Sequence, residues 1–267
     1  MRMINKVRIF SNKLEFSNAI EEELIQLLKL YDFEVVEDDT FDLAIALGGD
    51  GAFLRMVKNN NFNSNVYYIG VNTGTLGFLQ EIRPEKLKVF VDSLNRNEFK
   101  VDKIGVLETK IITEDSVSRY YSLNELVIRE LDLNVFTAGV YVGGHKLETF
   151  AGDGLLISTS VGSSAYNTSF RGALIYNTFH TLQVTPIAPI NSKIYRNLLN
   201  PIVVPEKMHI EIYPLKKTIL AIFDGENNKY KDVKKIECYV KNKKLKFLRM
   251  KDYNFIDIVN EKFLNDK

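Results

Sequence analysis

An acidic residue flanked by glycines is the first feature of this sequence that could do chemistry. Asp50 stands in Gly48-Gly49-Asp50-Gly51, after the apolar run 43–47 and before a segment with helical spacing. A strand end followed by a glycine turn and a helix presents backbone N–H groups that bind anions. A carboxylate repels phosphate, so Asp50 is not explained as a phosphate ligand, and it is either the N-cap of the helix or a catalytic residue.

Two further segments place polar residues where strands end or begin. Residues 70–80, GVNTGTLGFLQ, follow an apolar strand and contain Asn72, so the predicted sheet presents two glycine-containing loops on one edge. Ligands collect at this edge of open α/β sheets, which favours a cleft there. In LNELVI, residues 123–128, Asn124 and Glu125 interrupt an apolar run. Taken alone, such a pair is more often simply the outward face of a strand.

The segment 151–174 combines an acid with small and hydroxyl-bearing residues. Asp153 lies between two glycines before a predicted strand, and Gly-Ser-Ser-Ala-Tyr, residues 162–166, predicts a helix over 163–175. Hydroxyls at a helix start are donors for a sugar or a base edge, although an ordinary capped helix explains them equally well. A nucleophilic serine is not indicated, because G-x-S-x-G is absent and no histidine can be assigned as its base.

The elements that must position these residues change in type along the chain. The first hundred residues alternate strands with helices, which predicts an α/β domain with a largely parallel sheet. After about Val101, short runs rich in β-branched and aromatic residues are separated by turn residues, which predicts an antiparallel, all-β domain. The expected boundaries are 1–101 for the α/β domain with the glycine loop, 102–248 for the β-rich domain, and 249–267 for a helical tail that packs back on the N-terminal domain.

Composition excludes several classes of protein. There are 35 basic and 34 acidic residues, so the net charge of +1 shows no bias towards nucleic acid or membrane surfaces. Cys238 is the single cysteine, the three histidines lie far apart without metal-ligand spacing, and no stretch reaches the ~20 apolar residues of a membrane span. We therefore expect a soluble, cytoplasmic protein with no nucleic-acid or membrane partner.

Together the four segments resemble the NAD kinase family. Gly-Gly-Asp-Gly, Asn-Thr-Gly-x-Leu-Gly-Phe, Asn-Glu and Asp-Gly…Ser-Thr-x-x-Gly-Ser-x-Ala-Tyr-x-x-Ser follow one another in the order that family has, over residues 42 to 225. The resemblance implies a Rossmann-like N-terminal α/β domain, a β-sandwich-like C-terminal domain that binds NAD, and NAD held between them. It implies transfer of the ATP γ-phosphoryl group to the 2′-hydroxyl of the adenosine ribose, with Mg²⁺ or another divalent cation accompanying ATP, in a homodimer or homotetramer.

The resemblance also implies roles for individual residues. Asp50 matches the catalytic proton acceptor, Asn124 and Glu125 a pair that contacts NAD, and Asp153 a carboxylate near the nicotinamide half. Residues 164–169 match the segment around the adenine. The full set of expected binding residues is Gly49, Gly51, Arg55, Asn72, Asn124, Glu125, Asp153, Ser164, Ala165, Tyr166, Asn167, Thr168, Ser169 and Ala188. No protein metal ligand is assigned, and Asp224 matches a late acidic position.

Two positions depart from the family pattern and keep alternatives open. Val161 stands where the family has a residue that can hydrogen-bond, and Ala151 stands where many members carry a basic residue near the substrate phosphates. A non-catalytic NAD(P) sensor of the same fold is therefore one alternative. A lipid or sugar kinase is the other, because such enzymes share the Gly-Gly-Asp-Gly turn.

Overall fold

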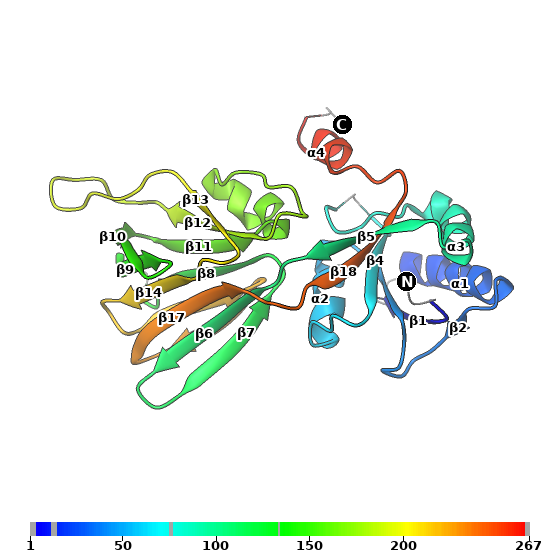
Figure 1. Ribbon diagram of the computed structural model, residues 1–267, viewed down its shortest axis with the longest axis horizontal. Coiled ribbons are helices and arrows are strands. Elements are labelled where there is room, and N and C mark those ends of the chain that lie inside the picture. The colour runs from blue at the N-terminus through cyan, green and yellow to red at the C-terminus, as the bar shows by residue number, and fades with distance from the viewer. Residues whose placement is uncertain (1–3, 12–14, 75–76, 133, 265–267) are drawn as a thin grey trace. The chain divides into compact units, whose positions relative to one another are not determined.

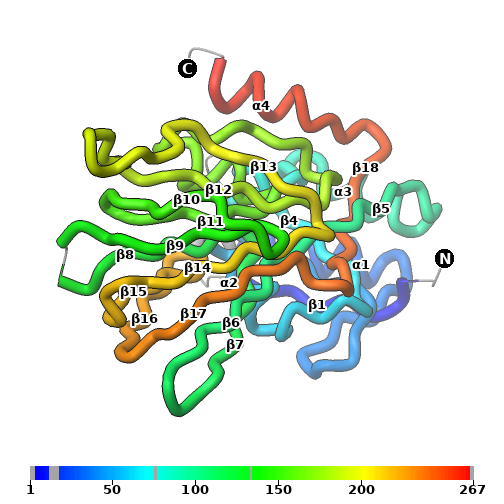
Figure 2. The backbone as a smooth tube through the Cα atoms, turned by 60° about the vertical axis from the view of Figure 1, so that its left-hand side comes forward, coloured from blue at the N-terminus to red at the C-terminus, as the bar shows by residue number. Residues whose placement is uncertain are grey.

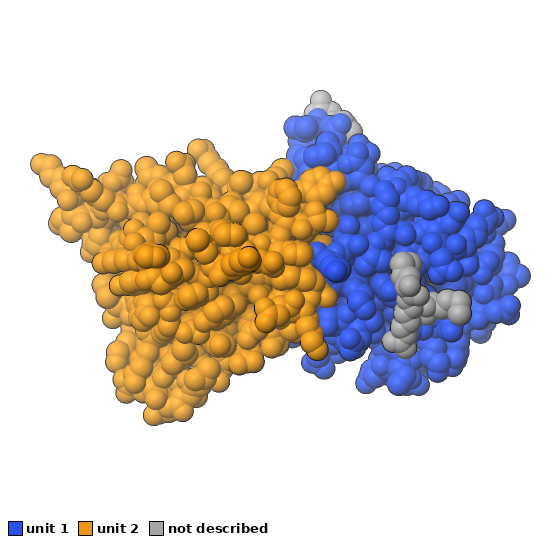
Figure 3. All heavy atoms as spheres, viewed as in Figure 1, with its two compact units in different colours: residues 1–103, 245–267 blue, residues 104–244 orange. Residues whose placement is uncertain are grey.

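The computed structural model describes residues 4–11, 15–74, 77–132 and 134–264 (Figure 1). The chain divides into two compact units, coloured separately in Figure 3. Unit 1 comprises Met1–Lys103 together with Leu245–Lys267, and unit 2 comprises Ile104–Lys244.

Unit 1 is built on a six-stranded sheet with the strand order β2-β1-β3-β4-β18-β5. The pairs β1–β2, β1–β3, β3–β4 and β4–β18 are all parallel. The elements are β1 (Lys6–Ser11), α1 (Glu15–Leu30), β2 (Glu34–Val35), β3 (Leu43–Gly48), α2 (Asp50–Asn59), β4 (Tyr67–Asn72), the 3₁₀ turn η1 (Pro84–Lys86), α3 (Leu87–Asn95), β5 (Phe99–Ile104), β18 (Leu245–Met250) and α4 (Phe255–Phe263).

Helices cover both faces of this sheet. Every residue of β3 and β4 is buried, as expected for parallel strands with helices on each side. The buried faces of α1 and α3 share one core with β1, β3 and β4, and the hydroxyl of Tyr31 contacts Asp92 between them at 3.5 Å. From α2, Phe53 packs edge-on against Phe247 of β18 with ring centroids 4.9 Å apart. The α/β architecture predicted for this part of the chain is confirmed.

The C-terminal part of the chain returns to unit 1. β18 pairs in parallel with β4, so residues 245–248, which the sequence pattern grouped with the β-rich domain, lie in the sheet of unit 1. Helix α4 follows, and the side chain of Asn254 caps it by accepting a hydrogen bond from the backbone N–H of Ile256 at 3.0 Å. At its C-terminal end, Phe263 packs against Phe78.

Unit 2 consists of two six-stranded sheets of antiparallel strands. One sheet has the order β10-β9-β14-β17-β6-β7 and the other β13-β12-β11-β8-β15-β16. The hairpin β6–β7 can be followed as the green loop of Figure 2. The strands are β6 (Leu107–Thr113), β7 (Val117–Ser122), β8 (Glu125–Glu130), β9 (Phe136–Val142), β10 (His145–Gly152), β11 (Gly154–Thr159), β12 (Thr181–Ile187), β13 (Ile202–Pro205), β14 (Ile210–Pro214), β15 (Ile219–Phe223), β16 (Glu226–Tyr230) and β17 (Val233–Val240).

One apolar core joins the two sheets of unit 2. It includes Leu107 and Ile111 from the first sheet and Leu126, Ile128 and Leu155 from the second. Buried residues alternate with more exposed ones along β6 and β9, so each strand turns one face inward, as in a sandwich. The predicted all-β, sandwich-like architecture is confirmed. Among the described residues, no helix combines the length and apolar character needed to cross a membrane.

Candidate functional site

Asp50 begins helix α2 where β3 ends, but it does not cap that helix. The N-cap is Gly49, whose carbonyl accepts from the backbone N–H of Ala52 and which has no side chain to make a cap. The Asp50 carboxylate turns instead to the neighbouring loop: Oδ2 accepts from the N–H of Phe78 and Oδ1 from the N–H of Leu79, both at 2.9 Å. The helix-cap explanation of this residue is therefore wrong for its side chain.

Gly77 lets the loop lie directly against the carboxylate. A Cβ at this position would stand 1.8 Å from Asp50 Oδ1 and 2.4 Å from Cγ, so no other residue fits without moving the loop. Gly51 is exposed, and a Cβ there would meet Nη1 of Arg55 at 3.5 Å. The exposed Arg55 guanidinium therefore lies beside the first turn of α2, one helical turn from Asp50.

The loop after β4 is tied to the loop after β3. Asn72 is buried, and its Oδ1 accepts from the N–H of Gly74 at 2.9 Å. The amide Nε2 of Gln80 donates to the carbonyl of Gly49 at 2.8 Å, and the N–H of Thr73 donates to the carbonyl of Gly48 at 3.3 Å. The structure thus brings Gly49, Asp50 and Asn72 together at the carboxyl ends of two adjacent parallel strands, where ligands bind in open sheets.

In unit 2, Asn124 and Glu125 lie at the start of β8 and are both buried. Burial rules out the explanation that the pair is a solvent-facing strand edge. Asp224, at the turn between β15 and β16, fixes this point: its carboxylate accepts from the N–H groups of Leu123, Asn124 and Glu125 at 2.7, 2.8 and 3.0 Å. The N–H of Asp224 returns a bond to the carbonyl of Glu125 at 3.1 Å.

Burial gives these two carboxyl groups unusual proton affinities. Desolvation, together with the nearby Asp224 charge, raises the pKa of Glu125 to about 8. Desolvation also raises the pKa of Asp224 to about 6, although its three backbone hydrogen bonds act in the opposite direction. Near pH 7 Glu125 is therefore mostly protonated and Asp224 mostly ionised. Glu125 Oε2 and the Oγ of Ser158, which faces Glu125 across β8 and β11, have no hydrogen-bond partner among the described residues.

The next segment wraps closely around the Asn124 backbone. A Cβ on Gly162 would lie 2.0 Å from the Asn124 carbonyl oxygen, so glycine is required for this approach. Thr159 adds two links: its Oγ1 donates to the carbonyl of Leu123 at 2.6 Å and accepts from the N–H of Gly162 at 3.1 Å. Asn124, Glu125 and the segment beginning at residue 162 are therefore one local structure.

The helix predicted over 163–175 is wrong. The chain forms two short 3₁₀ turns, η2 (Val161–Ser164) and η3 (Tyr166–Phe170). The cause is a buried polar centre: Asn167 donates to the carbonyls of Ser163 and Ala173 at 3.1 and 3.4 Å and accepts from Thr185 at 2.6 Å. A Cβ on Gly172 would clash with the Asn167 side chain at 2.0 Å, which keeps the turn tight.

The candidate binding residues of 164–169 differ in accessibility. Tyr166 and Ser169 are exposed, whereas Asn167 is fully buried and uses its amide to hold the segment in shape. Ser164 and Thr168 are half-buried, and their hydroxyls donate to the carbonyls of Val161 and Ala165 at 3.2 and 2.8 Å. Hydroxyls bonded in this way keep acceptor capacity for a ligand. Ala165 is half-buried between the two 3₁₀ turns.

Asp153 and Ala188 lie side by side where β11 begins and β12 ends. The N–H of Asp153 donates to the carbonyl of Ile187 at 3.0 Å, and both Asp153 and Ala188 are exposed. Cβ atoms on Gly152 and Gly154 would lie 2.7 and 2.3 Å from their nearest neighbours, so both glycines permit close strand packing around the acid. Ala188 has φ +43°, a strained conformation for alanine that turns the chain away at this point.

The two departures from the family pattern are both buried. Val161 is part of η2, and Ala151 is fully enclosed, with its N–H and carbonyl bonded to the side chain of Asn197 at 3.0 and 2.9 Å. A basic side chain at position 151 would have to begin from an enclosed Cβ in this arrangement.

Within the described part of the chain, no group of three or more His, Cys, Asp or Glu residues is arranged to hold a metal ion.

The fold has known counterparts among solved structures. Yeast NADH kinase complexed with NADH superposes with a TM-score of 0.89 at 19% identity, covering 100% of this chain and 90% of that one. An NAD kinase from Archaeoglobus fulgidus in complex with ATP gives a TM-score of 0.76 at 20% identity, covering 96% and 98%. At such identities the likeness establishes the fold class, an α/β unit with a two-sheet β unit.

Sequence similarity shows, beyond the fold class, the family of the chain. Residues 10–99 match the ATP-NAD kinase N-terminal domain and residues 123–250 the ATP-NAD kinase C-terminal domain. The chain is 37% identical over 235 residues to the NAD kinase of Finegoldia magna, covering 85% of each protein. It is 33% identical over 254 residues to that of Staphylococcus saprophyticus, covering 93% and 94%. The chain belongs to the ATP-NAD kinase family.

Proposed function

We propose that this chain is an NAD kinase, which transfers the γ-phosphoryl group of ATP to the 2′-hydroxyl of the adenosine ribose of NAD and so makes NADP. The observation that carries the proposal is the match to both family domains in order. These matches cover the unit that holds Asp50 and the unit that holds Asn124 and Glu125. A lipid or sugar kinase that shared the Gly-Gly-Asp-Gly turn alone would not account for the second match.

Asp50 is the proposed proton acceptor. The ribose oxygen forms a bond to the γ-phosphorus while the bond from that phosphorus to the β,γ-bridging oxygen breaks. The hydroxyl proton passes to an Asp50 oxygen, and ADP leaves. A carboxylate is a weak base towards a sugar hydroxyl, so it first orients the hydroxyl as a hydrogen-bond acceptor. It takes the proton late, when the forming P–O bond has made the hydroxyl acidic.

The surroundings of Asp50 support this role. Each carboxylate oxygen accepts one backbone N–H, from Phe78 or Leu79, at 2.9 Å. A carboxylate offers about four lone-pair sites, so each oxygen keeps the capacity to accept a substrate hydroxyl. The two amides therefore fix the plane of the carboxylate and leave it able to accept a further hydrogen bond. The exposed cation of Arg55, one turn along α2, is suited to a phosphate.

In unit 2, the buried Glu125 side chain of the proposed binding region is mostly protonated near pH 7. A protonated Glu125 is a hydrogen-bond donor as well as an acceptor, and Oε2 is without a partner among the described residues. We propose that Glu125 and Asn124 recognise hydroxyl and ring atoms of the dinucleotide. We propose that Tyr166 and Ser169 flank the adenine and that Asp153 meets the nicotinamide half as an exposed carboxylate.

The phosphoryl donor is proposed to be ATP with a divalent cation, expected to be Mg²⁺. Mg²⁺ keeps several waters and is commonly held by substrate phosphates rather than by an all-protein cage. We therefore assign no protein residue as a ligand of this cation. When bound, it offsets the charge of the triphosphate.

A homodimer or homotetramer is proposed as the working assembly. Support comes from exposed apolar side chains gathered in one stretch of unit 2, where Phe179 is 62% and Ile194 86% exposed. Apolar surface of this kind marks sites of protein association. A cytoplasmic location is proposed as well, because a free, buried Cys238 suits a compartment that keeps thiols reduced.

One assay tests the proposed function. The purified protein is incubated with ATP, Mg²⁺ and NAD, and NADP is followed with a coupled NADP-dependent dehydrogenase. Steady NADP formation is the expected result. Binding of NAD measured by calorimetry, without NADP formation, would favour the non-catalytic sensor. If the protein shows no NAD binding and no NADP formation, both hypotheses are contradicted. Another acceptor is then favoured.

A further inference from the structure

The segment 77–83 is held from two sides within unit 1. On one side its backbone N–H groups bind the carboxylate of Asp50 at the start of α2. On the other side its side chains contact α4, the helix near the C-terminal end of the chain. Residues about 170–185 positions apart in sequence thus meet on one short stretch of backbone.

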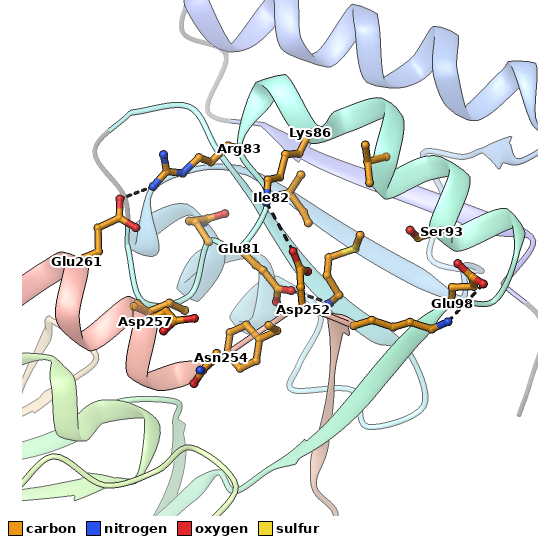
Figure 4. Close-up of a pocket in the computed structure, with 16 residues that line it drawn as sticks. Glu81, Ile82, Arg83, Lys86, Ser93, Glu98, Asp252, Asn254, Asp257 and Glu261 are labelled. Carbon is orange, nitrogen blue, oxygen red and sulfur yellow. Dashed lines mark hydrogen bonds and ion pairs between the residues drawn. The ribbon is translucent and has the colours of Figure 1, made fainter.

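The contact with α4 is made at two points. The ring of Phe78 lies 6.4 Å from that of Phe255 and 5.4 Å from that of Phe263, centroid to centroid. Arg83 forms an ion pair with Glu261 of α4, drawn as a dashed line in Figure 4. Between the segment and the residues leading into α4 lies a pocket of about 480 Å³, lined among others by Gln80 and Tyr253. The helix therefore rests on contacts at the two ends of the segment, with a hollow beside them.

Phe78 connects the two sides directly. The same residue donates its backbone N–H to Asp50 Oδ2 and places its ring against α4. Gly77, before it, has no room to move towards Asp50, because even a Cβ would stand 1.8 Å from the carboxylate. A movement of the Phe78 ring that carries its backbone along would shift the peptide that orients the carboxylate.

We infer that Phe78 is a positioning residue for phosphoryl transfer, and that α4, through Phe255 and Phe263, sets the orientation of the Asp50 carboxylate. This inference rests on the proposed role of Asp50 as proton acceptor. The aromatic contacts hold the Phe78–Leu79 amides in place, and these amides hold the carboxylate plane in which the attacking hydroxyl must lie. Phosphoryl transfer depends on such positioning, and small misplacements of a catalytic group slow a reaction strongly.

The test removes the shorter of the two aromatic contacts between α4 and Phe78 and leaves the residues of the proposed site unchanged. Phe263→Ala truncates a ring that is 46% exposed at the end of α4, so the unit should still fold. Ile256→Ala, on the same helix and 57% exposed, is the matched control. Phe263→Tyr keeps the ring and is the conservative rescue. Two kinds of measurement are made on each protein. NMR gives the amide hydrogen exchange at Phe78 and Leu79, and steady-state kinetics give kcat and the KM for NAD.

In Phe263→Ala we expect exchange at both amides to rise by about fivefold or more, because the loop opens more often. We expect kcat to fall by roughly tenfold while KM for NAD changes less than about twofold, since substrate binding is not involved. Ile256→Ala and Phe263→Tyr should match the wild type in both measurements.

Every other pattern overturns the inference. Unchanged exchange and unchanged kcat would show that the contact of α4 with Phe78 through Phe263 does not control the loop. A lower kcat without faster exchange would place the effect of α4 elsewhere, and faster exchange with a normal kcat would show that the amides do not position Asp50. If the wild-type protein makes no NADP, the proposed function fails, while the exchange measurement still decides whether α4 holds the loop on Asp50.

Discussion

The two oxygens of the Asp50 carboxylate each accept one hydrogen bond from consecutive backbone amides, and this has a consequence for mutagenesis. An amide side chain has one acceptor and one donor group. Asparagine at position 50 would therefore turn its NH₂ towards one of the two N–H donors, leaving the amide of Phe78 or Leu79 unpaired. The substitution removes the proton acceptor and also weakens the loop that orients it.

Asp50→Asn is expected to lower kcat by about 10²–10⁴-fold, the usual contribution of a positioned general base. NAD binding should survive, because the proposed contacts to NAD by Asn124, Glu125 and Asp153 lie in unit 2. Steady-state NADP formation and NAD calorimetry measure the two effects separately. Turnover near that of the wild type would contradict the assignment of Asp50 as proton acceptor.

Glu125 offers a pH-dependent test at the same scale. The folded protein holds the Glu125 proton up to a pKa of about 8, while the ordinary value is 4.5. Between these values the folded state binds more protons than the unfolded chain, so the stability that Glu125 contributes is present at low pH and is lost as pH rises towards 8. The raised pKa of Asp224, about 6 against an ordinary 3.8, acts in the same direction over a lower range.

Glu125→Gln should therefore stabilise unit 2 relative to the wild type more at pH 8 than at pH 5, with a difference of about 3 kcal/mol. Glutamine is neutral at both values and close in shape to a protonated glutamic acid. Urea unfolding of both proteins at the two pH values measures the difference. An equal offset at pH 5 and pH 8 would mean that Glu125 is ionised in the folded protein.

The residue scale also shows where sequence reasoning stops. The candidate residues at positions 50, 124, 125 and 153 could be identified from motifs, because glycines and acidic residues at predicted strand ends can be recognised in the sequence. The reach of Asp224 to Asn124, 100 positions away, could not be derived from spacing. The resemblance to the family identified Asp224 as a matching acidic position but did not say what this residue does. The role follows from the pairing of β8 with β15, which brings the β15–β16 turn beside residues 123–125.

At the scale of elements, periodicity predicted the alternating strands and helices of the first hundred residues, because apolar spacing there reflects burial on a sheet. The same signal failed at residues 163–175. Small and hydroxyl residues after Gly162 are compatible with a helix start, but the buried amide of Asn167 draws the chain into a closed turn instead. A single side chain that bonds to backbone groups four and six residues away overrides local helix propensity.

Gly77→Ala tests the element that holds Asp50. The added methyl would stand 1.8 Å from the carboxylate, so the loop must shift and kcat should fall by about 10²-fold or more. Gly74→Ala is the control in the same loop, because a Cβ at that position would have no described heavy atom within 4 Å. NADP formation and the thermal midpoint of both variants are compared. Equal activity in the two variants would show that the loop does not lie against Asp50 during turnover.

At the scale of the whole molecule, the sequence predicted an α/β domain followed by an all-β domain. It did not predict that β18 returns to the sheet of the first domain. β18 is apolar and short like the strands before it, and its parallel pairing with β4 spans almost 180 residues. The composition of a strand does not tell which sheet it joins, because burial on either sheet selects the same residue types.

The proposed assembly is the prediction at this scale. Light scattering should give a mass two or four times 30.7 kDa. Ile194→Glu, at a position that is 86% exposed in unit 2, should lower that mass, because a charge in an apolar contact is costly to desolvate. Leu30→Glu, 73% exposed on α1, is the control and should leave it unchanged. A monomer mass at every concentration would contradict the proposal.

The buried thiol of Cys238 has a practical consequence. It lies in the core of unit 2, fully enclosed, and burial raises its pKa to about 12, so almost none of the reactive thiolate exists at neutral pH. As this is the single cysteine of the chain, the wild-type protein should be nearly silent towards maleimides. A cysteine introduced at one exposed position in each unit would then accept a fluorophore pair without any background substitution. Energy transfer between the two dyes would then measure whether the distance between the labelled positions changes when substrates are added.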